Sequence, residues 1–331
     1  MPETMRYAQA VNQALRLLLR EDERVFLAGE DIGIYGGAFG VTDGLLDEFG
    51  DARVRDTPIS EEAIAGLAVG ASITGMRPIV EMQFSDFVVN AMDPIVNQAA
   101  KLHFMYGGNV DVPLVIRLPG GGGTGAAAQH SQSLEAWFAH IPGLKVVAPA
   151  TGQDAHDLLL AAVLDPNPVM VFEHKLLYKD EGPVEVRAAV ADTPATIGEA
   201  AVVRPGDDLT IVSYSIMTGR SLEAAESLER SGISAEVVDL RSLRPLDIET
   251  VRASVKRTGR LLITHEAPAA VGVGAEVAAG VVESDALDYL LAPISRVCGR
   301  PIPMPYAKKL EAAVIPQSDD VERAAKELLN A

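Results

Sequence analysis

Short apolar runs alternate with longer segments of helical period along almost all of this 331-residue sequence. The runs at 113–118 (PLVIRL) and 209–214 (LTIVSY) are largely apolar rather than strictly alternating. Such runs are typical of parallel strands that helices cover on both faces. Between the runs, segments such as 4–20 repeat apolar residues with the period of a helix. The pattern predicts an α/β fold made of doubly wound sheets.

The alternation is interrupted once, between 174 and 198, where neither period is sustained. We therefore predict a first α/β domain at 1–175, a linker at 176–200 and a second, smaller α/β domain at 201–331. Helices are expected at 4–20 (with Thr4 as its N-cap), 42–49, 60–75, 86–105, 152–164, 218–231, 247–257 and 274–284. Strands are expected at 24–29, 78–84, 113–118, 143–148, 168–173, 209–214, 235–240, 260–264 and 293–297.

The composition limits the function classes. Apolar residues make up 48% of the chain, which is enough for two cores. The 28 basic and 46 acidic residues give a net charge of −18, which repels phosphate backbones, so no nucleic-acid partner is expected. The single cysteine, Cys298, allows no disulfide framework. Neither a signal-peptide pattern nor a membrane-spanning run is recognisable, so we expect a cytoplasmic location and no membrane partner.

Two glycine-rich segments invite a search for phosphate loops. They are GEDIGIYGG at 29–37 and LPGGGGTGAAAQH at 118–130. Neither ends in the Gly-Lys-Ser/Thr of a Walker loop, so neither predicts a P-loop nucleotide site. The second segment can be a flexible loop or a place where backbone approaches a ligand closely.

Four residues stand where chemistry is common. Glu61 and Glu62 follow a strand and begin a helix rich in small residues, and they point about 100° apart. Acidic residues in a first helical turn also simply complement the helix dipole, so both interpretations stay open. His130 follows the glycine-rich loop, and Phe87 follows the strand at 78–84, near the edge where ligands bind in α/β folds.

Five motifs occur in one order along the chain: RVFLAGEDIG, DTPISEEAIAGLAVGAS, RPIVEMQFSDFVVNAMDPIVNQAAK, AAQHSQSLEAWFAHIPGLKVVAP and DLRSLRPLD. Together they resemble the beta subunit of the thiamine-diphosphate-dependent decarboxylating component of 2-oxo acid dehydrogenase complexes. The resemblance extends from about residue 4 to residue 328. It implies an N-terminal domain that binds the cofactor's pyrimidine and a transketolase C-terminal-like domain.

The resemblance also implies roles for individual residues. Glu61 matches the glutamate that hydrogen-bonds N1′ of the aminopyrimidine and so promotes proton transfer within the cofactor. Phe87 matches the aromatic residue that packs on the pyrimidine, and Ile59 and Gln83 match positions lining the same pocket. His130 matches the histidine that assists proton transfer and passage of the acyl group to the lipoyl disulfide.

Metal sites and partners follow from the same resemblance. Family members hold potassium with backbone carbonyls, here at Leu114, Ala162, Val163, Asp165 and Asn167. The superfamily holds magnesium and the diphosphate with a GDG…NN motif, and this sequence has neither GDG nor an Asn-Asn pair. An alpha subunit is therefore expected to supply that half of the site, in a heterotetramer of two alpha and two beta chains. The other expected partner is the lipoyl acyltransferase core.

The resemblance implies that the substrate is a small 2-oxo acid or a related compound. Pyruvate is favoured by VVNAMDPIVNQAAK and IPMPYAKKLE, acetoin comes second and branched-chain 2-oxo acids third. A self-sufficient thiamine enzyme would need the missing motif. A non-catalytic homologue would be expected to lack Glu61 or His130. The small-residue segments 60–75 and 269–281 are candidates for subunit contacts.

Overall fold

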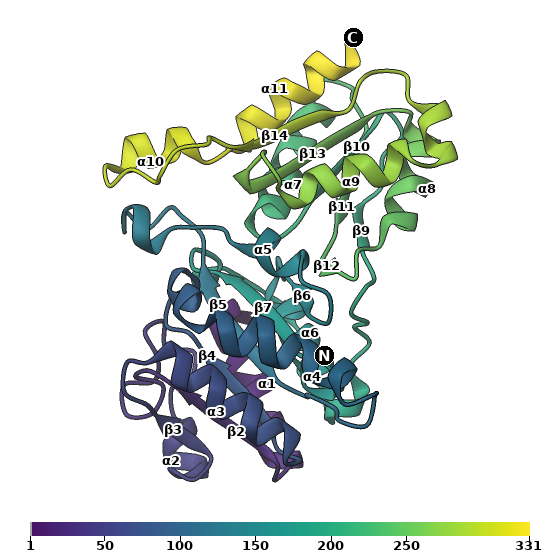
Figure 1. Ribbon diagram of the computed structural model, residues 1–331. Coiled ribbons are helices and arrows are strands. Elements are labelled where there is room, and N and C mark those ends of the chain that lie inside the picture. The colour runs from purple at the N-terminus through teal and green to yellow at the C-terminus, as the bar shows by residue number, and fades with distance from the viewer. Residues whose placement is uncertain (1) are drawn as a thin grey trace. The chain divides into compact units, whose positions relative to one another are not determined.

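The computed structural model describes residues 2–331 and divides into two compact units. The first comprises Met1–Gly120 and Trp137–Ile197, and the second Gly121–Ala136 and Gly198–Ala331. Each unit contains a mostly parallel sheet with helices packed on it, so the predicted α/β fold is confirmed (Figure 1).

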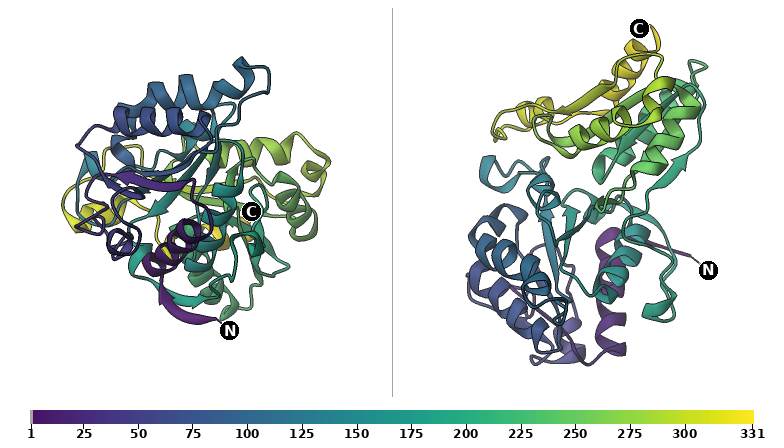
Figure 2. Two further views of the ribbon diagram at one scale, coloured as in Figure 1. Left: turned by 90° about the horizontal axis from the view of Figure 1, so that it is seen from below. Right: turned by 45° about the vertical axis from the view of Figure 1, so that its right-hand side comes forward.

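The first unit is built on parallel strands in the order β6-β7-β5-β4-β2-β3. They are β2 (Val25–Gly29), β3 (Val54–Asp56), β4 (Arg77–Glu81), β5 (Val115–Gly120), β6 (Lys145–Val147) and β7 (Val169–His174). Its α-helices are α1 (Tyr7–Glu21), α2 (Leu45–Phe49), α3 (Glu61–Ile73), α4 (Ala100–Met105) and α6 (Gly152–Leu164). Helices α1 and α6 pack together on one face, and α3 packs with the segments before α4 on the other (Figure 2).

The second unit has the strand order β14-β13-β10-β11-β9, in which only β9 runs antiparallel. The strands are β9 (Ala201–Arg204), β10 (Leu209–Ser213), β11 (Ala235–Asp239), β13 (Leu261–Pro268) and β14 (Ser295–Gly299), and the short β12 is Ser242–Arg244. The helices are α7 (Ile216–Glu229), α8 (Ile248–Thr258), α9 (Val273–Val282), α10 (Lys308–Val314) and α11 (Ser318–Leu329). Helix α5 (Glu135–Ala139) begins in this unit. Buried residues of α7 and α11 pack on β10 and β11 to form its core.

Two predicted elements are wrong in detail. Thr4 is not a helix cap: it lies in β1 (Glu3–Arg6), opposite Pro183 of the antiparallel strand β8 (Glu181–Val184), and Arg6 is the N-cap of α1. The helix expected at 86–105 is three segments: the 3₁₀ turn η1 (Ser85–Ala91), the π-helical η2 (Asp93–Ala99) and α4. Pro94 lies in the first turn of η2, where it has no N–H for a continuing α-helix.

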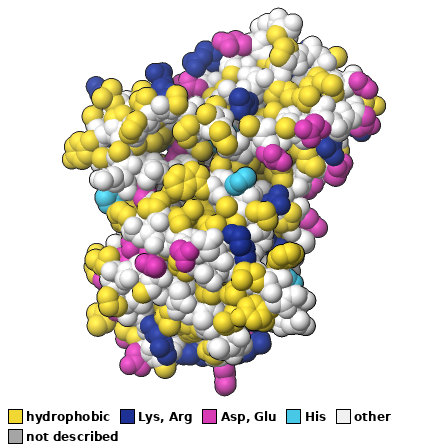
Figure 3. Space-filling model, viewed as in Figure 1, with side chains coloured by type: hydrophobic (Ala, Val, Ile, Leu, Met, Phe, Trp, Pro, Cys, Tyr) yellow, Lys and Arg dark blue, Asp and Glu magenta, His cyan; other side chains and the backbone are white. Residues whose placement is uncertain are grey.

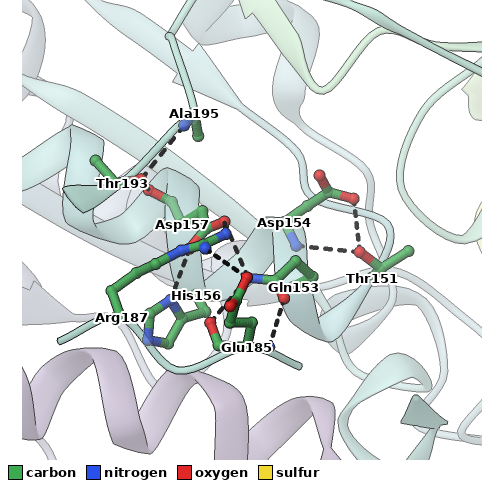
Figure 4. A network of polar contacts seen from close by, with 9 residues as sticks. All are labelled: Thr151, Gln153, Asp154, His156, Asp157, Glu185, Arg187, Thr193 and Ala195. Atoms are coloured by element: carbon green, nitrogen blue, oxygen red, sulfur yellow. Dashed lines mark hydrogen bonds and ion pairs between the residues drawn. The ribbon is translucent and has the colours of Figure 1, made fainter. Parts of the chain in front are cut away.

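The segment expected as a linker is folded onto the first unit over much of its length. Arg187 donates from Nε and Nη2 to the Asp157 carboxylate of α6 at 3.0 and 2.6 Å (Figure 4). Burial alone would raise the pKa of Asp157, but hydrogen bonds from His156 and Arg187 outweigh it and lower that pKa. Thr193 also donates to the Asp157 carbonyl at 2.9 Å. The segment lacks regular periodicity, and for that reason the sequence predicted a linker. These hydrogen bonds nevertheless fix it to the first unit.

A buried ionic cluster joins three central strands of the first unit. Arg117 of β5 is 1% exposed and donates to both oxygens of Glu173 on β7, at 2.7 and 2.6 Å. It also donates to Glu81 at the end of β4, and Tyr178 donates to Glu173 at 2.7 Å. Burial raises the pKa of Glu81; Arg117 opposes this shift and Glu173 adds to it. The cluster fixes the carboxyl ends of these strands.

No helix within residues 2–331 is both long and apolar enough to cross a bilayer. On the face drawn in Figure 3, acidic and basic side chains are interspersed among apolar ones, without a continuous basic patch.

Candidate functional site

The carboxyl edge of the first unit's sheet gathers most of the predicted site residues. In open parallel sheets, ligands bind at this edge because loops from neighbouring strands meet there. Ile59 and Glu61 follow β3, and Gln83 and Phe87 follow β4, which is the direct neighbour of β2. The sheet order therefore brings together side chains that are more than 20 positions apart in the sequence.

Glu61 is the first residue of α3 and is only 7% exposed, whereas its neighbour Glu62 is exposed. Asn90 donates from Nδ2 to Glu61 Oε2 at 3.3 Å. The N-cap Ser60 provides no side-chain cap for the first-turn N–H groups of α3. The two carboxylates thus differ in environment as their 100° separation predicts, and only Glu61 is turned into the protein.

Glu30 is a site residue that the sequence reasoning missed. It directly follows β2, is 5% exposed, and its Oε1 has no hydrogen-bond partner within the described residues. Burial raises its pKa, and the negative charges of Glu61 and Asp31 raise it further. A carboxyl group in this setting favours its protonated form. The sequence does contain a signal for Glu30: in the Gly29-Glu30-Asp31 segment it directly follows a strand that is fully buried.

Two aromatic residues, Phe84 and Phe87, follow β4 at the same edge of the sheet. Phe87 is half-buried and meets Phe84 edge-to-face, with ring centroids 6.1 Å apart. Phe84 in turn meets Phe39 at 5.7 Å. Gln83 donates to Asp31 at 3.2 Å, while the side chain of Ile59 is 82% exposed.

This set of side chains fits an aminopyrimidine ring. Phe87 offers an aromatic surface, and Glu61 offers a carboxyl group that can exchange a proton with a ring nitrogen. The hydroxyls of Thr57 and Ser85, which follow β3 and β4, are buried without hydrogen-bond partners among the described residues. Unpaired buried polar atoms at a sheet edge are consistent with a polar ligand there.

His130 belongs to the second unit, so the sheet edge of the first unit does not contain it. It ends the 3₁₀ turn η3 (Ala128–His130) and is half-buried. The preceding glycine-rich loop is bound within the second unit by Glu266 of β13 and Glu311 of α10.

Four of the residues expected to hold potassium lie in or just after the last turn of α6, and the fifth, Leu114, directly precedes β5. The Leu114 carbonyl already accepts from the Val169 N–H at 2.8 Å, and the Val163 carbonyl accepts from the guanidinium of Arg77. Asp165 Oδ1 accepts from the backbone and side-chain amides of Asn167, both at 2.9 Å. Ala162 is fully buried.

The free carbonyls of a helix end suit a monovalent cation, but a guanidinium already lies against one of them. Within residues 2–331, no group of three or more His, Cys, Asp or Glu side chains is arranged to hold a metal ion.

Comparison with protein families gives two matches that follow the two halves of the chain. Residues 3–181 match the pyrimidine binding domain of transketolase, and residues 198–321 match the transketolase C-terminal domain. A solved structure described as a split-gene transketolase, an inactive beta4 tetramer, superposes with a TM-score of 0.78 over 98% of both chains. At 24% identity, this likeness shows a shared fold.

Named relatives are similar over nearly the whole chain. The mitochondrial pyruvate dehydrogenase E1 component subunit beta of Caenorhabditis elegans is 48% identical over 327 residues, covering 99% of this chain and 93% of that protein. The mitochondrial subunit beta-2 of Oryza sativa is 46% identical over 322 residues, covering 97% of this chain and 85% of that protein.

Proposed function

Since this chain belongs to the beta-subunit family of the pyruvate dehydrogenase E1 component, we propose that it supplies one half of an active site that decarboxylates pyruvate and passes the acyl group to a lipoyl disulfide. Enzymes of this family depend on thiamine diphosphate. The observation that carries the proposal is full-length identity near 46% together with the buried Glu61 at the sheet edge.

Thiamine diphosphate, when bound, supplies the electron sink that decarboxylation of a 2-oxo acid requires. Glu61, the buried first residue of α3, would hold the proton at N1′ of the pyrimidine. Phe87 would offer the ring an aromatic surface, and Gln83 and Ile59 would contribute from the same edge of the sheet. His130 assists proton transfer as the acyl group moves to the lipoyl sulfur.

The alpha subunit is proposed to complete this site. The chain lacks the GDG and Asn-Asn signature, so magnesium and the diphosphate are assigned to the alpha subunit, in a heterotetramer of two alpha and two beta chains. The outward face of α3 is a candidate contact because a Cβ at Gly66 or Gly70 would meet nothing within 4 Å. Ala65 and Ala68 of the same helix are fully buried in their own unit and cannot contribute.

The second small-residue segment, 269–281, is used differently. A Cβ at Gly274 would lie 2.8 Å from the His265 ring, and one at Gly280 would lie 2.6 Å from Ile248. These glycines let α9 pack closely on β13 and α8 within the second unit, which weakens the case for a subunit contact there.

Pyruvate is proposed as the substrate because the relatives carry that name, which favours it over acetoin and branched-chain 2-oxo acids. The lipoyl acyltransferase core is the proposed acceptor. Potassium at the end of α6 and a cytoplasmic location stay predictions.

The test uses the neighbouring pair of carboxylates. In the complex with the alpha subunit, Glu61→Gln is expected to lower pyruvate-dependent reduction of an artificial acceptor by about 100-fold or more, since an amide cannot exchange the proton. Glu62→Gln makes the same change of charge at an exposed site and is expected to stay within about twofold of wild type. Near-wild-type activity of Glu61→Gln would overturn the assignment, and faster turnover of acetoin or a branched acid would overturn the substrate.

A further inference from the structure

The glycine-rich loop before His130 raises the question of where its backbone hydrogen bonds go. After Gly120 the chain leaves the sheet and has no regular structure until η3. Gly121, Gly123 and Gly125 have φ of +81°, +93° and +73°, which favours glycine at all three positions. Such a loop is intrinsically flexible unless other groups fix it.

Two carboxylates of the second unit accept the N–H groups of this loop. Gly123 and Gly125 donate to Oε1 and Oε2 of Glu311 at 2.8 and 2.9 Å, so one side chain binds two loop amides at once. Gly122 donates to Oε1 of Glu266 at 2.7 Å. Bonds from amides to a charged acceptor are among the stronger hydrogen bonds in proteins.

Glu311 is only 1% exposed, although it lies on the short helix α10. Within residues 2–331 it forms no ion pair with Lys or Arg. A carboxylate buried in this way is costly unless it is well hydrogen-bonded, and the two loop amides occupy both of its oxygens. Its burial is therefore tied to the position of the loop.

Glu266 holds the chain on both sides of His130. Besides Gly122, which precedes the histidine, it accepts a 3.0 Å hydrogen bond from the hydroxyl of Ser133, which follows it. The loop also packs closely on the C-terminal segment, since a Cβ at Gly122 would lie 2.7 Å from Ile315 Cδ1. His130 thus lies on a short chain segment whose two ends are bound to the same carboxylate.

We propose that Glu311 and Glu266 are positioning residues that hold the His130 loop in the geometry needed for acyl transfer to the lipoyl group. This inference rests on the role of His130 in the proposed function. A misplacement of about 1 Å in a catalytic group can cost up to about 100-fold in rate, so loss of one carboxylate acts on transfer chemistry without touching the substrate.

The test compares Glu311→Gln with wild type in the reconstituted complex, using a lipoylated domain as acyl acceptor and a dye as artificial acceptor. The ratio of the acyl-transfer rate to the dye rate is expected to fall about tenfold or more, because an amide can accept from only one of the two glycines. Asp247→Asn is the matched control, since Asp247 accepts from the Ala200 and Thr250 amides at 3.0 and 3.1 Å in the same unit. It is expected to leave the ratio unchanged.

A double-variant cycle separates positioning from general stability. If Glu311 acts through His130, Glu311→Gln adds no further loss of transfer to His130→Ala. A fully additive loss, or a ratio equal to that of the Asp247→Asn control, would overturn the inference. If His130→Ala itself transfers acyl groups normally, the proposed role of His130 fails first, and the inference fails with it.

Ser133→Ala provides a second variant in case Glu311→Gln does not assemble. It removes one hydroxyl from a partly exposed position, and it is expected to lower the same ratio by a smaller factor, again without adding to His130→Ala. If Glu311→Gln does not assemble and Ser133→Ala transfers acyl groups at the wild-type ratio, the inference is overturned.

Discussion

Glu135 is expected to make the stability of this protein fall as the pH rises. It begins α5, is buried, and its Oε2 has no hydrogen-bond partner among the described residues. Burial raises the pKa of this carboxyl group from 4.5 to about 8, and the charge of Glu266 in the same unit adds to the shift. Burial is the main cause that raises the pKa of the Tyr214 hydroxyl, and the charge of Glu135 raises it further.

The magnitude follows from linkage between protonation and folding. The folded protein holds the Glu135 proton more tightly than the unfolded chain, so its contribution is complete below pH 4.5 and is lost as the pH rises to about 8. Each pH unit in this window costs about 1.4 kcal/mol of the free energy of unfolding, or roughly 5 kcal/mol in all. At pH 7 the loss is about 3 kcal/mol.

Glu135→Gln keeps the shape of the neutral side chain and cannot ionise. The variant is expected to match wild type near pH 5 and to melt about 5–10 °C higher near pH 8, measured by thermal unfolding of both proteins across this range. The exposed Glu62→Gln is the control and is expected to show no such divergence. A difference in melting temperature that does not change with pH, or a wild type that is the more stable protein at pH 8, would refute the reasoning.

Three further predictions follow from the first unit. Phe87→Ala is expected to weaken thiamine diphosphate binding to the mixed complex by roughly 1–3 kcal/mol through lost aromatic contact, and an unchanged dissociation constant in a titration would remove Phe87 from the site. Arg117→Ala leaves Glu81 and Glu173 buried without their cation and is expected to cost about 3–5 kcal/mol in urea unfolding at pH 7; a cost below about 1 kcal/mol would contradict the ionic description of this cluster. Replacing potassium with choline is expected to lower the melting temperature if the end of α6 binds the cation, and equal melting in both salts would argue against that site.

Much of the fold could be predicted because the central strands of both units are short, buried and largely apolar. Buried parallel strands such as β5 and β10 leave a signal that does not depend on their partners. The strand β8 left none, because a Pro and a Gly interrupt it and its pairing with β1 lies far away in the sequence. The break in 86–105 was also missed, since a π-helical segment preserves an apolar pattern close to that of an α-helix.

The site divides in the same way. The burial of Glu61 and the exposure of Glu62 follow from the angle between successive helix positions, which the sequence contains. The pairing of Glu311 with the loop amides does not, because 186 positions separate Glu311 from Gly125 and no pattern links a buried carboxylate to distant glycines. Glu30 was missed because its proximity to Glu61 becomes apparent only when the order of the strands in the sheet is known.

The central claim is that this chain holds half of a cofactor site. Binding of thiamine diphosphate with magnesium should be measured by titration for this chain alone, for the alpha subunit alone and for the two mixed. The account predicts saturable binding, with turnover of pyruvate, only for the mixture. Tight binding and turnover by this chain alone would contradict it, and a self-sufficient thiamine enzyme would then be the better description.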